Sequence, residues 1–177
     1  ITIKYGEQLQ VLRNDLSYNR YSAETYDLGA IYTQVTDGKG TEIAYNRIHD
    51  CRSYGIYLDD GNANYRIHHN VVYGLSYSGG VQMSLVLRQP SLGHSIYHNT
   101  FYGGRIGTSI SSTDGWEFLG HSCSMAGTEI KNNILAGFRA VGSAQYIGYP
   151  NSSDDAVLEN NIVTGTAEED WGQCEGQ

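Results

Sequence analysis

Six short segments of the chain share one pattern of apolar and polar positions. In each segment an aliphatic residue is followed, after two variable positions, by an asparagine, and an apolar residue comes two positions later. The six asparagines are Asn14, Asn46, Asn70, Asn99, Asn133 and Asn161. The apolar positions lie in short stretches with a period of two residues, which is typical of strands. A unit this short cannot bury its apolar side chains alone, so the repeat predicts stacked turns around a shared interior.

A third, glycine-led strand follows each of the first four asparagines, beginning at Gly29, Gly55, Gly80 and Gly107. Asparagine tolerates left-handed backbone, and its amide can bond along a stack, so the six asparagines are expected to form corners and an interior ladder. The sequence therefore predicts an all-β solenoid of about six coils. We expect a single domain over residues 1–177, with a long loop insertion at 111–128 and a C-terminal tail or cap at 166–177.

The segments TDGKGTEIAYNRIHD, GIYLDDGNANYRIHHNVVYG and SIYHNT resemble repeats of the right-handed parallel β-helix superfamily. This is the fold of pectate lyases, polygalacturonases and related secreted bacterial polysaccharide-active proteins. The resemblance covers roughly residues 10–165. It implies a right-handed parallel β-helix, a secreted, extracellular location, and action on or binding to a polysaccharide or oligosaccharide.

Alternation along the glycine-led strands predicts which side chains face outward. Ile56 and Leu58 are expected to face the interior, and so is Tyr32 in the preceding turn. Tyr57 and Asp59 are expected to share an outer face, about 7 Å apart along the strand. An outward acid beside a tyrosine is typical of a sugar-binding surface.

These residues suggest a glycosidase, because glycoside hydrolysis needs two carboxyl groups flanking the scissile bond. Tyr57 would stack on a sugar ring, and Asp59 would act as acid or nucleophile. Asp37, from the preceding turn, and the adjacent Asp60 are the candidates for the second carboxylate. Asp60 with Gly61 is also a turn dipeptide, in which the carboxylate could serve the backbone instead.

Arg88, Trp116 and His94 are the further candidates for substrate binding. Arg88 leaves the strand of the next turn and could face a uronate, while Trp116 lies in the long loop. His94 follows Gly93 where polygalacturonases carry a Gly-His-Gly motif, so the resemblance implies a place near substrate. A polysaccharide lyase is the alternative enzyme. Ca²⁺ would be a cofactor only in that case, and no acidic cluster is arranged as a Ca²⁺ cage.

The remaining histidines before the asparagine corners are interpreted as structural. His68 and His69 precede Asn70 on a different strand from Asp59. His98 takes the place of His69 one turn later. His69 and His98 are expected to form a column along the corner.

Composition restricts the partners. The formal charge of −8 argues against nucleic acid and anionic membrane surfaces. No apolar run approaches the roughly 20 residues that span a bilayer. Of the three cysteines, Cys123 and Cys174 share the last third of the chain and are the expected disulfide; three unpaired thiols are the alternative.

A non-catalytic module remains an alternative function: a structural, adhesive or filament-forming extracellular β-helix. The tail TAEEDWGQCEGQ offers charged residues to cap an open strand edge, whereas ITIKYGEQLQ offers no comparable cap. The chain starts at Ile1 without a leader segment. We therefore expect a mature form or a fragment. The uncapped front favours either a fragment or a stacking partner that covers the N-terminal end.

Overall fold

The computed structural model describes residues 1–18, 28–76, 83–103, 105–110, 118–121, 124–136 and 156–164. For residues 83, 88, 89, 105–110 and 163 it describes the backbone alone. All the regular elements in these ranges are β-strands, and every pair of neighbouring strands is parallel. In the described ranges no helix is long and apolar enough to cross a bilayer.

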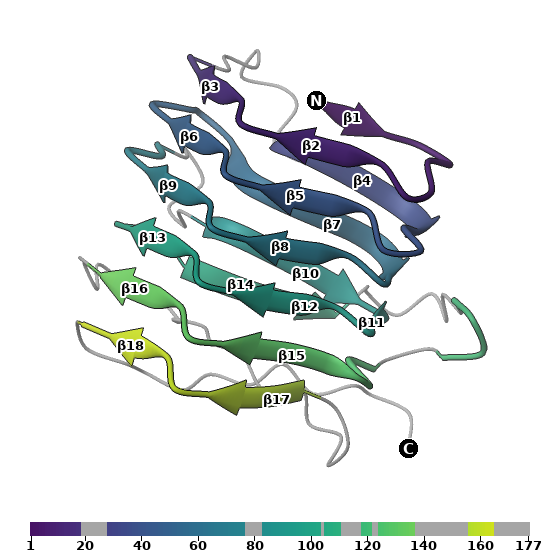
Figure 1. Cartoon of the computed structure of the whole chain (residues 1–177). Coiled ribbons are helices and arrows are strands. Elements are labelled where there is room, and N and C mark those ends of the chain that lie inside the picture. The colour runs from purple at the N-terminus through teal and green to yellow at the C-terminus, as the bar shows by residue number, and fades with distance from the viewer. Residues whose placement is uncertain are drawn as a thin grey trace.

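The strands stack into three sheets. Sheet A contains β1 (Thr2–Ile3), β4 (Gly29–Asp37), β7 (Tyr54–Ala63), β10 (Met83–Gln89) and β14 (Arg105–Ile110), with β11 (Ser91–Leu92) beside β7. Sheet B contains β2 (Gln10–Leu12), β5 (Glu42–Ala44), β8 (Arg66–His68), β12 (Ser95–Tyr97), β15 (Thr128–Lys131) and β17 (Ala156–Glu159). Sheet C contains β3 (Asp15–Ser17), β6 (Arg47–His49), β9 (Val71–Tyr73), β13 (Thr100–Tyr102), β16 (Ile134–Ala136) and β18 (Ile162–Val163). In Figure 1, sheets B and C form one bent front layer and sheet A lies behind them.

The predicted fold class is confirmed: the chain is an all-β parallel solenoid. It has about four turns rather than the predicted six. The difference lies in the last two asparagine repeats, whose described strands β15–β18 extend sheets B and C but not sheet A. At the other end, β1 covers the edge of β4, because Thr2 and Ile3 pair with Tyr32 and Thr33.

The asparagine ladder is confirmed in full. Side-chain amides are joined in one chain of hydrogen bonds, each 2.9–3.0 Å long, that runs through Asn14, Asn46, Asn70, Asn99, Asn133 and Asn161. Asn70 shows the pattern: its Nδ2 donates to Asn99 Oδ1 and to the carbonyl oxygen of Ile43, and its own Oδ1 accepts from Asn46 Nδ2. Asn70 also receives the backbone N–H of Asn46. Each interior amide is therefore saturated by the turns on either side.

The asparagines were expected to take the left-handed conformation at the corners, but the residue before each asparagine takes it instead. These residues have φ between 53° and 58° and are Arg13, Tyr45, His69, His98, Asn132 and Asn160. The asparagine is left free to direct its amide inward, while the preceding side chain is displayed on the surface. A left-handed backbone costs a non-glycine residue about 1–2 kcal/mol, which the ladder bonds offset.

The interior is filled by the apolar columns that the repeat predicted. Sheet B contributes a buried column of Ile43, Ile67, Ile96 and Ile130, and sheet C one of Ile48, Val72, Phe101 and Leu135. Each fully buried side chain of this size contributes about 1.5–3 kcal/mol relative to an exposed one.

The glycines that lead the first two long strands of sheet A do not pair with each other. Tyr54, not Gly55, is the partner of Gly29, so Tyr32 pairs with Tyr57. Tyr32 and Tyr57 consequently lie in one cluster separate from the main core, while Ile56 and Leu58 belong to the core as expected. The prediction that Tyr32 faces the interior is therefore wrong. It counted positions from the leading glycine of each strand, and these glycines are not paired in the sheet.

Asp60 and Gly61 form a β-bulge inside β7 rather than a turn between strands. Gln34 pairs with Asp59 and Thr36 with Asn62, so two residues of β7 oppose one of β4. Asp60 and Gly61 both have positive φ, of 47° and 89°. The bulge lets a long strand bend while pairing continues on both sides of it.

We predict that Asn70→Leu destabilises the fold by about 3 kcal/mol or more, since at least two buried groups lose partners at about 1–3 kcal/mol each. Asn14→Leu, at the end of the ladder, should cost clearly less, because the Asn46 oxygen loses only the Asn14 Nδ2 donor and keeps the backbone N–H of residue 14. Denaturant unfolding monitored by far-ultraviolet circular dichroism measures both. Equal effects of the two substitutions would contradict the ladder's role.

Candidate functional site

The Tyr57–Asp59 surface is buried, so its predicted exposure is wrong. Tyr57 is 3% exposed and Asp59 is 1% exposed. The Tyr32 hydroxyl donates to Asp59 Oδ2 at 2.6 Å, and the Asn62 amide donates to the Asp59 carbonyl. Alternation gave the correct side of the sheet for Tyr57 and Asp59, but it says nothing about what covers that side. A catalytic role for Asp59 stays a prediction that would need this surface to open.

The other two carboxylate candidates serve the local backbone and neighbouring amides. Asp37 Oδ1 accepts from the Lys39 N–H at 3.0 Å and from Asn64 Nδ2 at 2.8 Å. Asp60 Oδ2 accepts from Gln34 Nε2 at 2.9 Å. Both side chains are partly exposed. Their part in hydrolysis likewise stays a prediction.

His94 is fully buried, so it cannot meet a ligand on the outer surface as the resemblance implied. Its Nδ1 accepts the backbone N–H of Tyr65 at 3.1 Å, which places the ring proton on Nε2, 2.9 Å from Ser91 Oγ. Burial lowers the pKa of His94 to about 3. It is a neutral ring that satisfies the backbone of a corner.

Several expected residues lie outside what the structure describes. The side chain of Arg88, the whole of Trp116, and the Cys123–Cys174 pair belong to this group. Cys51 is buried, with its Sγ 3.2 Å from the carbonyl oxygen of His49.

Residues 118–121 of the long loop lie beside the bulge. Phe118 and His121 form a short antiparallel bridge. A Cβ built on Gly61 would come within 2.9 Å of the Phe118 side chain. This segment therefore packs beside the Asp60–Gly61 bulge.

A groove of about 440 Å³ opens at the start of sheet B in the first turns. It is lined by Gln8, Leu9, Gln10, Lys39, Gly40 and Arg66. Gln10, Glu42 and Arg66 are in register on successive strands. Both cations have acidic partners: Lys39 pairs with Glu7 at 2.8 Å, and Arg66 with Glu42 at 3.7 Å. The groove is thus polar and locally balanced in charge.

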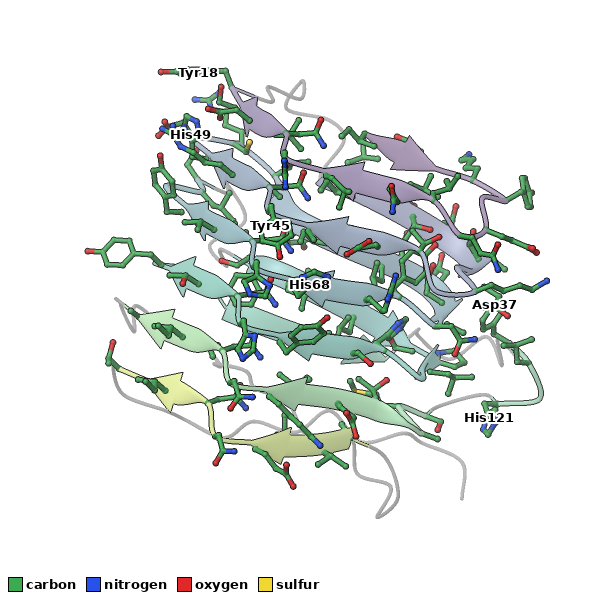
Figure 2. The ribbon with its side chains drawn as sticks, in the orientation of Figure 1. Tyr18, Asp37, Tyr45, His49, His68 and His121 are labelled. Carbon is green, nitrogen blue, oxygen red and sulfur yellow. The ribbon has the colours of Figure 1, made fainter. Side chains whose placement is uncertain are left out.

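Polar aromatic rings gather at the corner where sheet B ends, and we call them the ring cluster: Tyr45, His68, His69, Tyr97 and His98. Tyr45 stacks on His69 with ring centroids 4.9 Å apart, and His68 stacks on Tyr97 at 4.7 Å. His98 lies 5.1 Å below His69, which confirms the predicted histidine column. Figure 2 shows Tyr45 and His68 near each other in the middle of the front layer, away from Asp37 at its side.

A hydrogen-bonded chain links the cluster to a carboxylate. His68 Nε2 lies 2.9 Å from Glu42 Oε1, and His68 Nδ1 lies 2.9 Å from His69 Nδ1. The side chains of Glu42 and His68 are 19% and 7% exposed, whereas His69 is exposed. The sequence interpretation missed Glu42 and Tyr45. The signal was the shared position of Tyr45, His69 and His98 before successive ladder asparagines.

A second charged cluster, around His49, joins the first two turns on sheet C. His49 Nδ1 lies 2.7 Å from Asp50 Oδ2, and Nε2 lies 2.8 Å from Asp15 Oδ1. The hydrogen bond to Asp50, opposed by desolvation and aided by Asp15, raises the pKa of His49. Its ring stacks on Tyr73. Among the described residues, no group of three or more His, Cys, Asp or Glu side chains is arranged to hold a metal ion.

Comparisons of the chain with protein-family models, curated proteins and solved structures find no match. Of the resemblance to pectate lyases and polygalacturonases, the structure supports the parallel β-helix architecture alone. Function has to be argued from the surface itself, because this fold supports many chemistries.

We predict that His49 and His94 titrate on opposite sides of the ordinary value of about 6.5. His49 stabilises the fold below pH 6.5, and this contribution is lost as pH rises through its raised folded pKa. His94 has the opposite sign: acidification from 6.5 toward 3 favours the unfolded chain by about 1.4 kcal/mol per pH unit. An NMR titration of the ring ¹³Cε1 signals tests both, and a His94 midpoint near 6.5 would refute the burial argument.

Proposed function

We propose that the protein binds a polysaccharide across the outer surface of sheet B, from the groove to Tyr45. The observation that carries the proposal is the pairing of a polar groove with an exposed amphipathic ring on one surface. Tyr45 follows β5 directly, about 10 Å along the strand direction from Glu42. That distance leaves room for several hydrogen-bonding groups of an extended chain between the two.

The groups on this surface suit hydroxyl-rich ligands. Gln8 and Gln10 line the groove and bring amide donors and acceptors, which match sugar hydroxyls. Tyr45 is 50% exposed and carries a polar hydroxyl on an apolar ring. Arg13 lies 5.9 Å from the ring centroid and adds donors at the same edge.

The charge balance favours a neutral saccharide over a polyuronate. Lys39 and Arg66 already have acidic partners at the groove. The net charge of −8 would also repel a polyanion at long range. The extracellular location implied by the resemblance fits such a ligand and stays a prediction.

We predict that Tyr45→Ala weakens binding about tenfold, equivalent to about 1.4 kcal/mol, because the ring supplies both apolar contact and a hydroxyl. Isothermal titration against a panel of neutral oligosaccharides measures the affinity. Tyr102→Ala is the matched control, since Tyr102 is 59% exposed but lies on sheet C.

The control should keep wild-type affinity. Equal losses in the two variants would show that sheet B is not the binding surface. No binding to any oligosaccharide of the panel, together with an unchanged melting temperature in their presence, would favour a purely structural module.

A further inference from the structure

We propose that His69 is a general base for the hydrolysis of acyl esters, and that Glu42 and His68 are positioning residues that set its tautomer. The natural substrate would be an O-acylated saccharide, and that part of the inference rests on the proposed function. The base itself is argued from hydrogen bonds and does not depend on which molecule carries the ester.

The tautomers follow from the chemistry of the donors. An ionised Glu42 can only accept, so the neutral His68 ring carries its proton on Nε2. His68 Nδ1 must then accept, and the proton of the bond between the two rings belongs to His69 Nδ1. His69 is left with an unprotonated Nε2. When that nitrogen takes a proton, the charge is stabilised through His68 by the Glu42 carboxylate.

The His69 ring is held in place by its surroundings. Its backbone is fixed in the left-handed corner, and the Asn70 ladder amide follows immediately. Tyr45 covers one side of the ring with an interplanar angle of 22°, and His98 lies on the other side at 64°. A base with a fixed ring direction and a solvent-exposed edge is suited to act on a ligand lying over sheet B.

The step is balanced without a further reagent. His69 Nε2 takes a proton from water as the water oxygen bonds to the acyl carbon. Collapse of the tetrahedral intermediate breaks the bond between the acyl carbon and the sugar oxygen, and the proton passes from His69 to that oxygen. The products are a carboxylic acid and a free hydroxyl group.

Ester hydrolysis fits this site better than the other reactions considered. Glycoside hydrolysis needs two carboxyl groups at the bond, and the carboxylates beside the ring cluster are already paired: Glu42 with His68, and Glu129 and Glu159 with Lys131. Elimination needs a polyuronate as substrate, which the net charge of −8 would repel at long range. Activated water requires neither.

His121 gives a control for the base. Like His69 it is an exposed histidine, but it lies in the loop segment beside the Asp60–Gly61 bulge and is not part of the ring cluster. Hydrolysis of p-nitrophenyl acetate should fall about 100-fold or more in kcat/KM for His69→Gln, within the usual range for a general base. It should stay within about twofold of wild type for His121→Gln, and equal rates in the two variants would overturn the proposal.

The pH profile separates positioning from mere structural support. Desolvation, followed by the nearby His68 and His98, lowers the pKa of His69, so activity should rise with pH with a midpoint below 6.5. Tyr45, Tyr97 and, through His68, Glu42 also face the ring. Glu42→Gln keeps an acceptor oxygen but removes the charge, so it should lower the rate and move the midpoint to lower pH. An unchanged midpoint would remove Glu42 from the account.

A measurement on the wild-type protein does not depend on any variant folding. Two-bond ¹H–¹⁵N NMR correlations should show His69 protonated on Nδ1 and His68 on Nε2; the reverse tautomer at His69 would overturn the proposal.

Acetylated xylan then tests whether an acylated saccharide is the substrate. Cleavage of p-nitrophenyl acetate without acetate release from xylan or other acetylated polysaccharides would leave the base in place and refute the saccharide as substrate. Polysaccharide binding without any His69-dependent ester cleavage would refute His69 as the base and leave the proposed polysaccharide binding in place.

Discussion

The asparagine ladder, a continuous chain of hydrogen bonds between side-chain amides, is the interaction on which the rest of this structure depends. Each interior asparagine bonds to the turn before and the turn after, as Asn70 does with Asn46, Asn99 and the Ile43 carbonyl. A single hydrogen bond contributes only about 0.5–1.5 kcal/mol net, but an unsatisfied buried amide costs more. The ladder therefore fixes the register of sheets B and C more strongly than apolar contacts could do alone, because apolar contacts are non-directional.

The same constraint builds the candidate site. Because the asparagine turns inward, the residue before it takes the left-handed conformation and projects at the surface. Three successive turns place Tyr45, His69 and His98 at that position, where the ring centroids of Tyr45 and His69 lie 4.9 Å apart and those of His69 and His98 lie 5.1 Å apart. The Glu42–His68–His69 chain exists because β5 and β8 are held in register one turn apart. Fold and chemistry are thus linked through the corner.

The sequence was sufficient to predict features that repeat in every turn. The ladder asparagines and the apolar columns follow from one spacing rule, and the structure agrees with it. Features that depend on a single turn were not predictable in this way. The slip that pairs Tyr32 with Tyr57, and the bulge at Asp60–Gly61, arise from local strand length, which no periodicity records. Asp59 shows the other limit: alternation gives the side of a strand but not whether that side is covered.

Hydrogen exchange of the asparagine side-chain amides, followed by NMR, tests the central claim most directly. The chain carries its own control, because Asn132 and Asn160 are exposed corner residues next to the ladder residues Asn133 and Asn161. The ladder amides of Asn46, Asn70 and Asn99 should exchange far more slowly than those of Asn132 and Asn160, since each is bonded on both sides. Similar exchange rates in the two groups would contradict the account.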